Sequence, residues 1–141
     1  MKETTTVQQL MKKLLDLSSL NQEEFANAAG LTQGFISYTL QQDNIKMKNL
    51  KKFFVAANTE MIIKFGNWEI KRFDYALFSL SIQQLRKLSK REVSLKIGVG
   101  ESTFKSRLKR NSVSIQDLRI HFEGLGEELI FLINNVNHHI K

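Results

Sequence analysis

Residues 22–40 read QEEFANAAGLTQGFISYTL, and this stretch predicts two short helices joined by a sharp turn. Glu23 and Glu24 stand in the first turn of the first helix, where the helix dipole favours acidic side chains. Gly30 follows as the helix end, because a left-handed residue carries little steric penalty there only if it is glycine. Thr32 then offers a side-chain oxygen to cap the second helix. The stretch therefore orients two helices at a sharp angle to each other.

Helical patterns continue on both sides of this stretch. Before it, residues 7–17 carry apolar side chains at helical spacing and predict a first helix capped within residues 4–6. After it, a loop leads to residues 47–58, which predict a fourth, amphipathic helix.

A strand-like pattern follows the fourth helix. Residues 61–65 and 68–73 flank a Gly-Asn pair at 66–67, which is a signal for a two-residue hairpin turn. Pairing across this turn places apolar side chains on one face and sets Lys64 opposite Glu69 on the other. The segment therefore predicts a half-buried β-hairpin.

The whole pattern occurs twice in the chain. Sliding the sequence along itself until Gly30 meets Gly98 aligns apolar with apolar positions, without a gap from Leu17 to Glu60. The second copy also ends in strand-like segments, residues 129–133 and 136–140, around an Asn-Asn pair. An alternative for residues 127–137 is a single last helix, because short apolar runs fit both structures.

These patterns predict an α+β fold, mainly helical with a small β component. We expect two tandem units, residues 1–73 and 74–141, each with about four helices followed by a hairpin and related by a pseudo-twofold axis. An isolated hairpin is only marginally stable in water. We therefore expect the two hairpins to form a shared sheet or to stack face to face, with Trp68 buried between them.

The helical stretch resembles the helix-turn-helix of the lambdoid phage repressor and Cro family. The residues that carry the resemblance are Gln22, Glu23, Ala26, Gly30, Leu31, Thr32 and Gln33. It covers residues 7–58, and residues 85–108 match less closely, since Gly100 replaces the capping Thr and Ser94 the small Ala. The resemblance implies a sequence-specific regulator of transcription that binds double-stranded DNA, most simply a phage or mobile-element repressor.

In that family the second helix of the motif lies in the major groove, with its N-terminal residues on base edges. The resemblance implies DNA contacts from this helix in the first unit at Thr32, Gln33, Gly34, Ser37 and Tyr38. The matching positions in the second unit are Glu101, Ser102, Lys105 and Ser106. By their chemistry, Gln33 suits adenine, Glu101 suits the amino group of cytosine, and Lys105 suits guanine.

The resemblance also implies phosphate contacts beside these helices. The residues concerned are Gln22, Asn44, Lys46, Lys48, Lys109, Arg110, Asn111 and Ser112. Other interpretations stay open at several positions: Gln33 as an ordinary surface residue, Glu101 in a structural role because phosphates repel its charge, and Lys46 and Lys48 as part of a solvated face.

Composition agrees with a polyanionic partner. Lys and Arg outnumber Asp and Glu by 21 to 14, which gives a net charge of +7 and a pI near 9.7. The surplus is shared, with ten bases and seven acids in residues 1–73 and eleven bases and seven acids in residues 74–141. Both units are therefore able to face phosphate on this evidence.

Other residue types are informative by their absence. The chain has no cysteine, which excludes disulfides and thiolate chemistry and fits the cytosol, where a repressor would associate with the nucleoid. It has no apolar run of the ~20 residues that cross a bilayer, and its N-terminus lacks the apolar core of a signal peptide. We therefore expect no contact with a membrane.

Catalysis and cofactors are not expected. His121, His138 and His139 are the only imidazoles, and neighbours on a strand point to opposite faces, so 138 and 139 do not converge on one metal. No glycine-rich phosphate loop or activated nucleophile is evident. We expect no enzyme activity, metal, cofactor or small-molecule ligand.

Two other functions stay open. The first is a protein–protein module, such as an antirepressor or antitoxin that grips a partner protein with the same fold. The second is a DNA-binding subunit in which only the first unit touches DNA and the second serves dimerisation. A homodimer is also compatible with the sequence.

Overall fold

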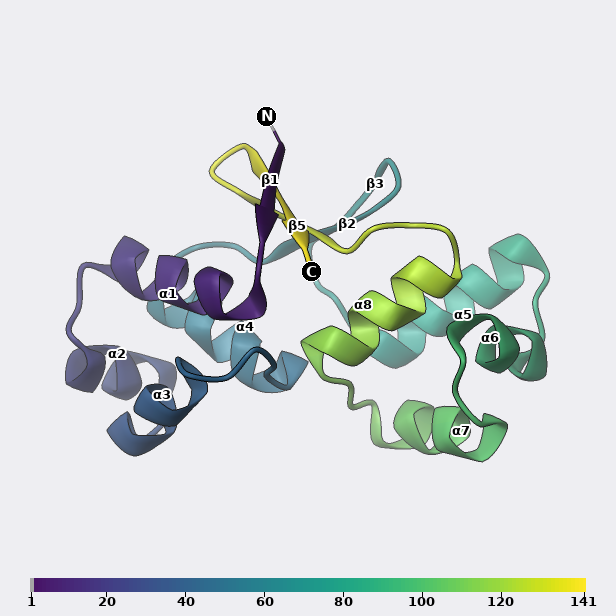
Figure 1. Ribbon diagram of the computed structural model, residues 1–141, viewed down its shortest axis with the longest axis horizontal. Coiled ribbons are helices and arrows are strands. Elements are labelled where there is room, and N and C mark those ends of the chain that lie inside the picture. The colour runs from purple at the N-terminus through teal and green to yellow at the C-terminus, as the bar shows by residue number, and fades with distance from the viewer. Residues whose placement is uncertain (1) are drawn as a thin grey trace.

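The computed structural model describes residues 2–141, which form an α+β structure of eight helices and one five-stranded sheet (Figure 1). The helices are α1 (Val7–Ser18), α2 (Gln22–Ala29), α3 (Gln33–Thr39), α4 (Met47–Ala56), α5 (Tyr75–Arg86), α6 (Lys90–Ile97), α7 (Glu101–Arg110) and α8 (Ile115–Gly124). The strands are β1 (Lys2–Thr5), β2 (Ile62–Phe65), β3 (Trp68–Ile70), β4 (Ile130–Ile133) and β5 (Val136–Ile140). The predicted α+β class is confirmed.

The two halves of the chain, residues 2–73 and 74–141, place their helices at matching positions. Under the shift that brings Gly30 onto Gly98, both ends of α1, α2 and α4 coincide with those of α5, α6 and α8. Helix α7 extends three residues beyond the counterpart of α3. In α3 the Thr39 hydroxyl donates to the carbonyls of Phe35 and Ile36, whereas α7 has the good helix former Arg107 at that position.

Side-chain caps explain where the helices start. Thr6 caps α1, within the predicted residues 4–6, and its hydroxyl accepts from the N–H of Gln9. Asn21 and Ser89 form matching capping boxes with the Glu three residues later in α2 and α6. Helix α4 ends two residues earlier than predicted, and Asn58 follows it with a left-handed φ of 51°.

Left-handed glycines terminate α2 and α6. Gly30 and Gly98 have φ angles of 70° and 69°, so both helices end in the same left-handed geometry. After Gly30 the chain is capped again by Thr32, as predicted, whereas Gly100 gives α7 no side-chain cap.

The two hairpins form one sheet, with strand order β1-β5-β4-β2-β3. At its centre β2 pairs with β4 in antiparallel register, and Ile63 lies opposite Phe131, its own counterpart in the second half. The register predicted inside the first hairpin, including Lys64 opposite Glu69, is also confirmed. The shared sheet was one of the two arrangements expected for the hairpins.

The end of the chain is a hairpin, and the alternative of a last helix over residues 127–137 is wrong. Asn134 and Asn135 have φ angles of 50° and 64° between β4 and β5. Two successive left-handed residues interrupt a helix but match the turn of a tight hairpin, and asparagine tolerates this conformation.

Trp68 is not buried, contrary to the expectation from the sequence. Its side chain is 43% exposed, because the hairpins join edge to edge through β2 and β4 and leave β3 at the rim of the sheet. Aromatic side chains of α5 and α8, rather than Trp68, pack against the first hairpin. Phe65 packs against Phe78 and Phe122, with ring centroids 5.3 and 5.0 Å apart.

Strand β1 is a feature that the sequence pattern does not predict. It pairs with β5 in parallel, so that the first and last strands of the described chain are neighbours in the sheet. In Figure 1 the sheet lies above the helices, with α1–α4 on the left and α5–α8 on the right. No counterpart of β1 covers β3 on the other rim among residues 2–141.

A second junction joins the halves at the start of α4 and α8. The N–H of Met47 donates to the carbonyl of Val113 at 3.0 Å, and the N–H of Ile115 donates to the carbonyl of Ile45 at 2.9 Å. Lys46 and Ser114 face each other between these bonds. Each residue thus bonds across the junction in the same way as its counterpart in the other half.

Candidate nucleic-acid interface

Helix α3 presents a polar face to solvent while its other face is anchored in the core. Ile36 and Thr39 are buried, which leaves Gln33, Gly34 and Tyr38 exposed. Tyr38 is 63% exposed, an unusual position for a large aromatic side chain.

Gln22 connects the start of α2 to this face. The Ser37 hydroxyl of α3 donates to Oε1 of Gln22 at 2.7 Å. The amide group of Gln22 is therefore held at the edge of α3. The structure brings together Gln22, Gln33, Gly34, Ser37 and Tyr38, with Thr32 capping the helix through a bond from the N–H of Phe35.

Helix α7 presents a different chemistry at the matching positions. Nζ of Lys105 lies 2.8 Å from Oε2 of Glu101, and this bond lowers the pKa of the Glu101 carboxyl below its usual range. The two charges offset each other, so the carboxylate is less repelled by nearby anions than its position suggests. Ser102 and Ser106 are exposed on the same helix, and Lys109 and Arg110 are exposed at its end.

Asn44 is exposed, and its side-chain oxygen bonds to the second half of the chain. Its Oδ1 accepts from the N–H groups of Ile45 and Gln116, both at 3.0 Å, and so caps the start of α8 from the other half of the chain. Asn111, the residue after α7, likewise holds the start of α5 by accepting from the N–H of Ala76 and donating to Asp74. Both asparagines, which the resemblance places at phosphates, make these intramolecular bonds and remain exposed.

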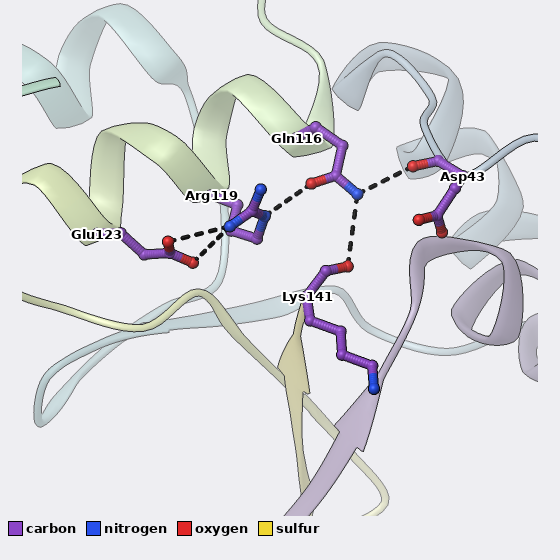
Figure 2. A network of polar contacts seen from close by, with 5 residues as sticks. All are labelled: Asp43, Gln116, Arg119, Glu123 and Lys141. Atoms are coloured by element: carbon purple, nitrogen blue, oxygen red, sulfur yellow. Dashed lines mark hydrogen bonds and ion pairs between the residues drawn. The ribbon is translucent and has the colours of Figure 1, made fainter. Parts of the chain in front are cut away.

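Figure 2 shows further contacts that fix the start of α8. The Gln116 side chain donates to the carbonyl of Asp43 at 2.9 Å and to that of Lys141 at 3.4 Å. Its own oxygen accepts from Arg119, which also pairs with Glu123 at 2.8 Å. The loop after α3, the start of α8 and the end of β5 are therefore tied together.

Helices α3 and α7 lie on one side of the molecule. In Figure 1 both helices stand at the lower edge, opposite the sheet, with the loops that follow them directed toward the middle. Lys46 and Lys48 are exposed at the start of α4, while Ser112 is partly buried in the loop after α7.

Sequence reasoning missed two exposed cations at the start of α6. Lys90 and Arg91 open α6 at the positions that Gln22 and Glu23 hold in α2, and both are exposed. The repeat itself held the signal, because Lys90 is the counterpart of Gln22.

A buried polar pair supports α7 from behind. Tyr75 Oη lies 3.0 Å from Nδ1 of His121, and the His121 ring contacts Phe104 of α7 with centroids 5.8 Å apart. Burial lowers the pKa of His121 to about 4 and raises the pKa of Tyr75 to about 12. Both groups are therefore neutral near pH 7, and the pair has a structural position in the core.

The other two histidines lie on β5. His138 is buried and its Nδ1 lies 3.1 Å from the Thr5 hydroxyl, whereas His139 pairs with Glu128. Among the side chains that the structure describes, those of residues 4–141, there is no group of three His, Asp or Glu residues that could hold a metal ion.

Comparison with known proteins adds no relative: no protein-family model, characterised protein or solved structure matches the chain. None of the helices described for residues 2–141 has the length and apolar character needed to cross a membrane.

Proposed function

We propose that the chain is a sequence-specific regulator of transcription that binds double-stranded DNA through two tandem helix-turn-helix units. The observation that carries the proposal is the exposure of α3 and α7 on one side of the molecule, each behind a glycine-terminated helix. In this arrangement an exposed helix enters the major groove while the preceding helix crosses the backbone. The net charge of +7 favours the same partner.

The proposal includes a pseudo-twofold relation between the units. Its support is that residues at both junctions pair with their own counterparts in the other half. Ile63 lies opposite Phe131 in the sheet, and Lys46 lies opposite Ser114 between the helices. A covalent pair of this kind places two reading helices at a fixed distance, as a dimer of single units does. A phage or mobile-element repressor of this design would act in the cytoplasm by occupying an operator and excluding polymerase.

Selection of binding sites from random duplexes tests the proposal. Because the base-facing residues differ between the units, such as Gln33 against Glu101, the selected site should contain two dissimilar half-sites about one helical turn apart. Failure to select any sequence would refute specific DNA binding. A perfect palindrome would refute the covalent pair, because it would show that two chains each use one unit.

A second candidate is a protein–protein module. Leu77, Leu80 and Leu85 of α5 are exposed, and clustered apolar side chains at a surface are typical of protein contacts. Stoichiometric capture of one protein, with no salt-dependent shift of the chain's own promoter fragment, would favour this function over DNA binding.

A further inference from the structure

The basic surplus is shared evenly by the two halves but not by their exposed helices. Helices α2 and α3 contain two acidic residues and no basic residue, whereas α6 and α7 contain seven basic and two acidic residues. The helix pair of the first half therefore carries net negative charge, and the helix pair of the second half carries net positive charge.

The contrast begins at the first turn of α2 and α6. Asn21 and Ser89 cap these helices in the same way, and both boxes are closed by a Glu at the third position. With the backbone matched, Lys90 and Arg91 stand where α2 has Gln22 and Glu23. Charge is thus the main difference at the helix terminus that crosses the DNA backbone in the proposed complex.

The cations of helix α7 differ in how far they are engaged with carboxylates. Lys105 is paired with Glu101, and Arg107 is partly buried with Nη2 at 3.6 Å from Oδ1 of Asp117. Lys109 and Arg110 are exposed at the C-terminal end of the helix, after the residues that would lie in the groove. The end of α7 is therefore the part of this helix best suited to meet phosphate.

These cations continue onto α4. Arg110 lines a recess of about 160 Å³ together with Lys48 and Lys51 of α4, so the cations of the two halves adjoin there. Asp74 also lines this recess, but the Leu77 N–H and the Asn111 side chain bond its carboxylate as the cap of α5. Lys46 is exposed at the start of α4, beside the junction with Ser114.

We infer that the two units divide the work of binding DNA: the second unit and the start of α4 hold the phosphate backbone, while α3 reads bases with few phosphate contacts of its own. The cations concerned are Lys46, Lys48, Lys90, Arg91, Lys109 and Arg110. The inference rests on the proposed function. It assigns the second unit a direct role on DNA, unlike the alternative in which that unit only dimerises.

The physical basis is counterion release. Each phosphate that a cation neutralises steepens the fall of log affinity with log salt by about 0.9 on duplex DNA. Lys90 and Arg91 contribute to this slope if they contact phosphates. Glu23, at the matching place in α2, repels a phosphate instead.

The test is a salt titration of the full chain on its selected duplex. Lys90→Gln with Arg91→Gln should reduce the slope by about 1.8. The reciprocal change, Gln22→Lys with Glu23→Arg, should steepen the slope and tighten binding. Lys71→Gln with Arg72→Gln, which removes two exposed cations at the sheet, is the matched control and should leave the slope unchanged. Circular dichroism at each salt concentration verifies folding.

The outcomes separate this inference from the proposed function. Absence of binding by the unmodified chain to any selected duplex refutes the proposed function and the inference with it. Specific binding whose slope is unaffected at Lys90 and Arg91, or equally affected by the control pair, refutes the division of labour alone.

Discussion

At the residue scale, Gln33 is the exposed side chain best suited to reading a base from α3. Its amide is able to bond adenine with two hydrogen bonds, and no such chemistry is available to the neighbouring Gly34. We predict that Gln33→Ala weakens binding to the selected site by about 1–3 kcal/mol and relaxes preference at one base pair. Competition binding against single-base variants of the site measures both effects. Unchanged specific binding would mean that α3 does not read bases at this residue.

Gly124 is a residue whose lack of a side chain is required by packing. A Cβ at this position would lie 2.6 Å from the carbonyl oxygen of Lys96 and 2.9 Å from Cα of Ile97. We predict that Gly124→Ala lowers the free energy of unfolding by about 1–3 kcal/mol, as overpacking does. Gly34→Ala is the control, because its Cβ would meet nothing within 4 Å, and it should stabilise α3 by up to about 1 kcal/mol. Urea unfolding of both variants measures these changes. Equal changes in the free energy of unfolding would contradict the packing argument.

At the element scale, the contact between α5 and α8 makes stability depend on pH. His121 faces Tyr75, with Arg107 and Asp117 nearby, and its pKa is about 4 in the fold against an ordinary 6.5. Between these values the unfolded chain binds a proton that the folded chain does not. The contribution of His121 to the free energy of unfolding is therefore fully present above pH 6.5. It falls by about 3 kcal/mol as the pH is lowered toward 4.

Unfolding in urea across this pH range measures the effect. His121→Phe with Tyr75→Phe is the matched variant, because Phe53 is the counterpart of His121 and replacing both polar partners leaves no orphaned group. This variant should lose most of the pH dependence between 6.5 and 4. A dependence as steep as that of the unmodified chain would show that other groups are responsible.

At the scale of the whole molecule, the sheet junction joins the two halves that carry α3 and α7. Phe131 of β4 is fully buried and stacks on Phe54 of the other half, with ring centroids 5.9 Å apart. We predict that Phe131→Ala lowers the free energy of unfolding by about 3–5 kcal/mol. It should also weaken the preference for one spacing of the two half-sites, measured on duplexes lengthened by one or two base pairs.

Leu14→Ala is the control for this change. Leu14 is fully buried in α1 of the first half, so its loss should cost about 2–5 kcal/mol without altering the spacing preference. A spacing preference that survives Phe131→Ala in the folded protein would show that the helical junction at Lys46 and Ser114 is sufficient. Trp68→Ala should have the smallest effect on stability, because that side chain is partly exposed at the rim.

Local features were predictable because neighbouring residues decide them. Helix ends follow from caps such as Thr32 and from left-handed glycines such as Gly30, each satisfied within a few residues of the chain. The register of the first hairpin follows from its two-residue turn and the alternation of its side chains. The repeat extended these predictions to the second half, where the motif by itself is weaker.

Tertiary structure decided how the two halves meet. The sequence favoured a joint between the hairpins, but an edge-to-edge pairing of β2 with β4 and stacked faces bury similar apolar side chains, so composition does not choose between them. That choice placed Trp68 at the rim, and the helical junction brought Asn44 within hydrogen-bond distance of Gln116. The pairing of β1 with β5 likewise joins opposite ends of the chain. Sequence by itself determines contacts whose partners lie within a few residues, because chain connectivity brings those partners together. Contacts between distant segments depend on which surfaces of the finished units fit, and only the folded chain holds that information.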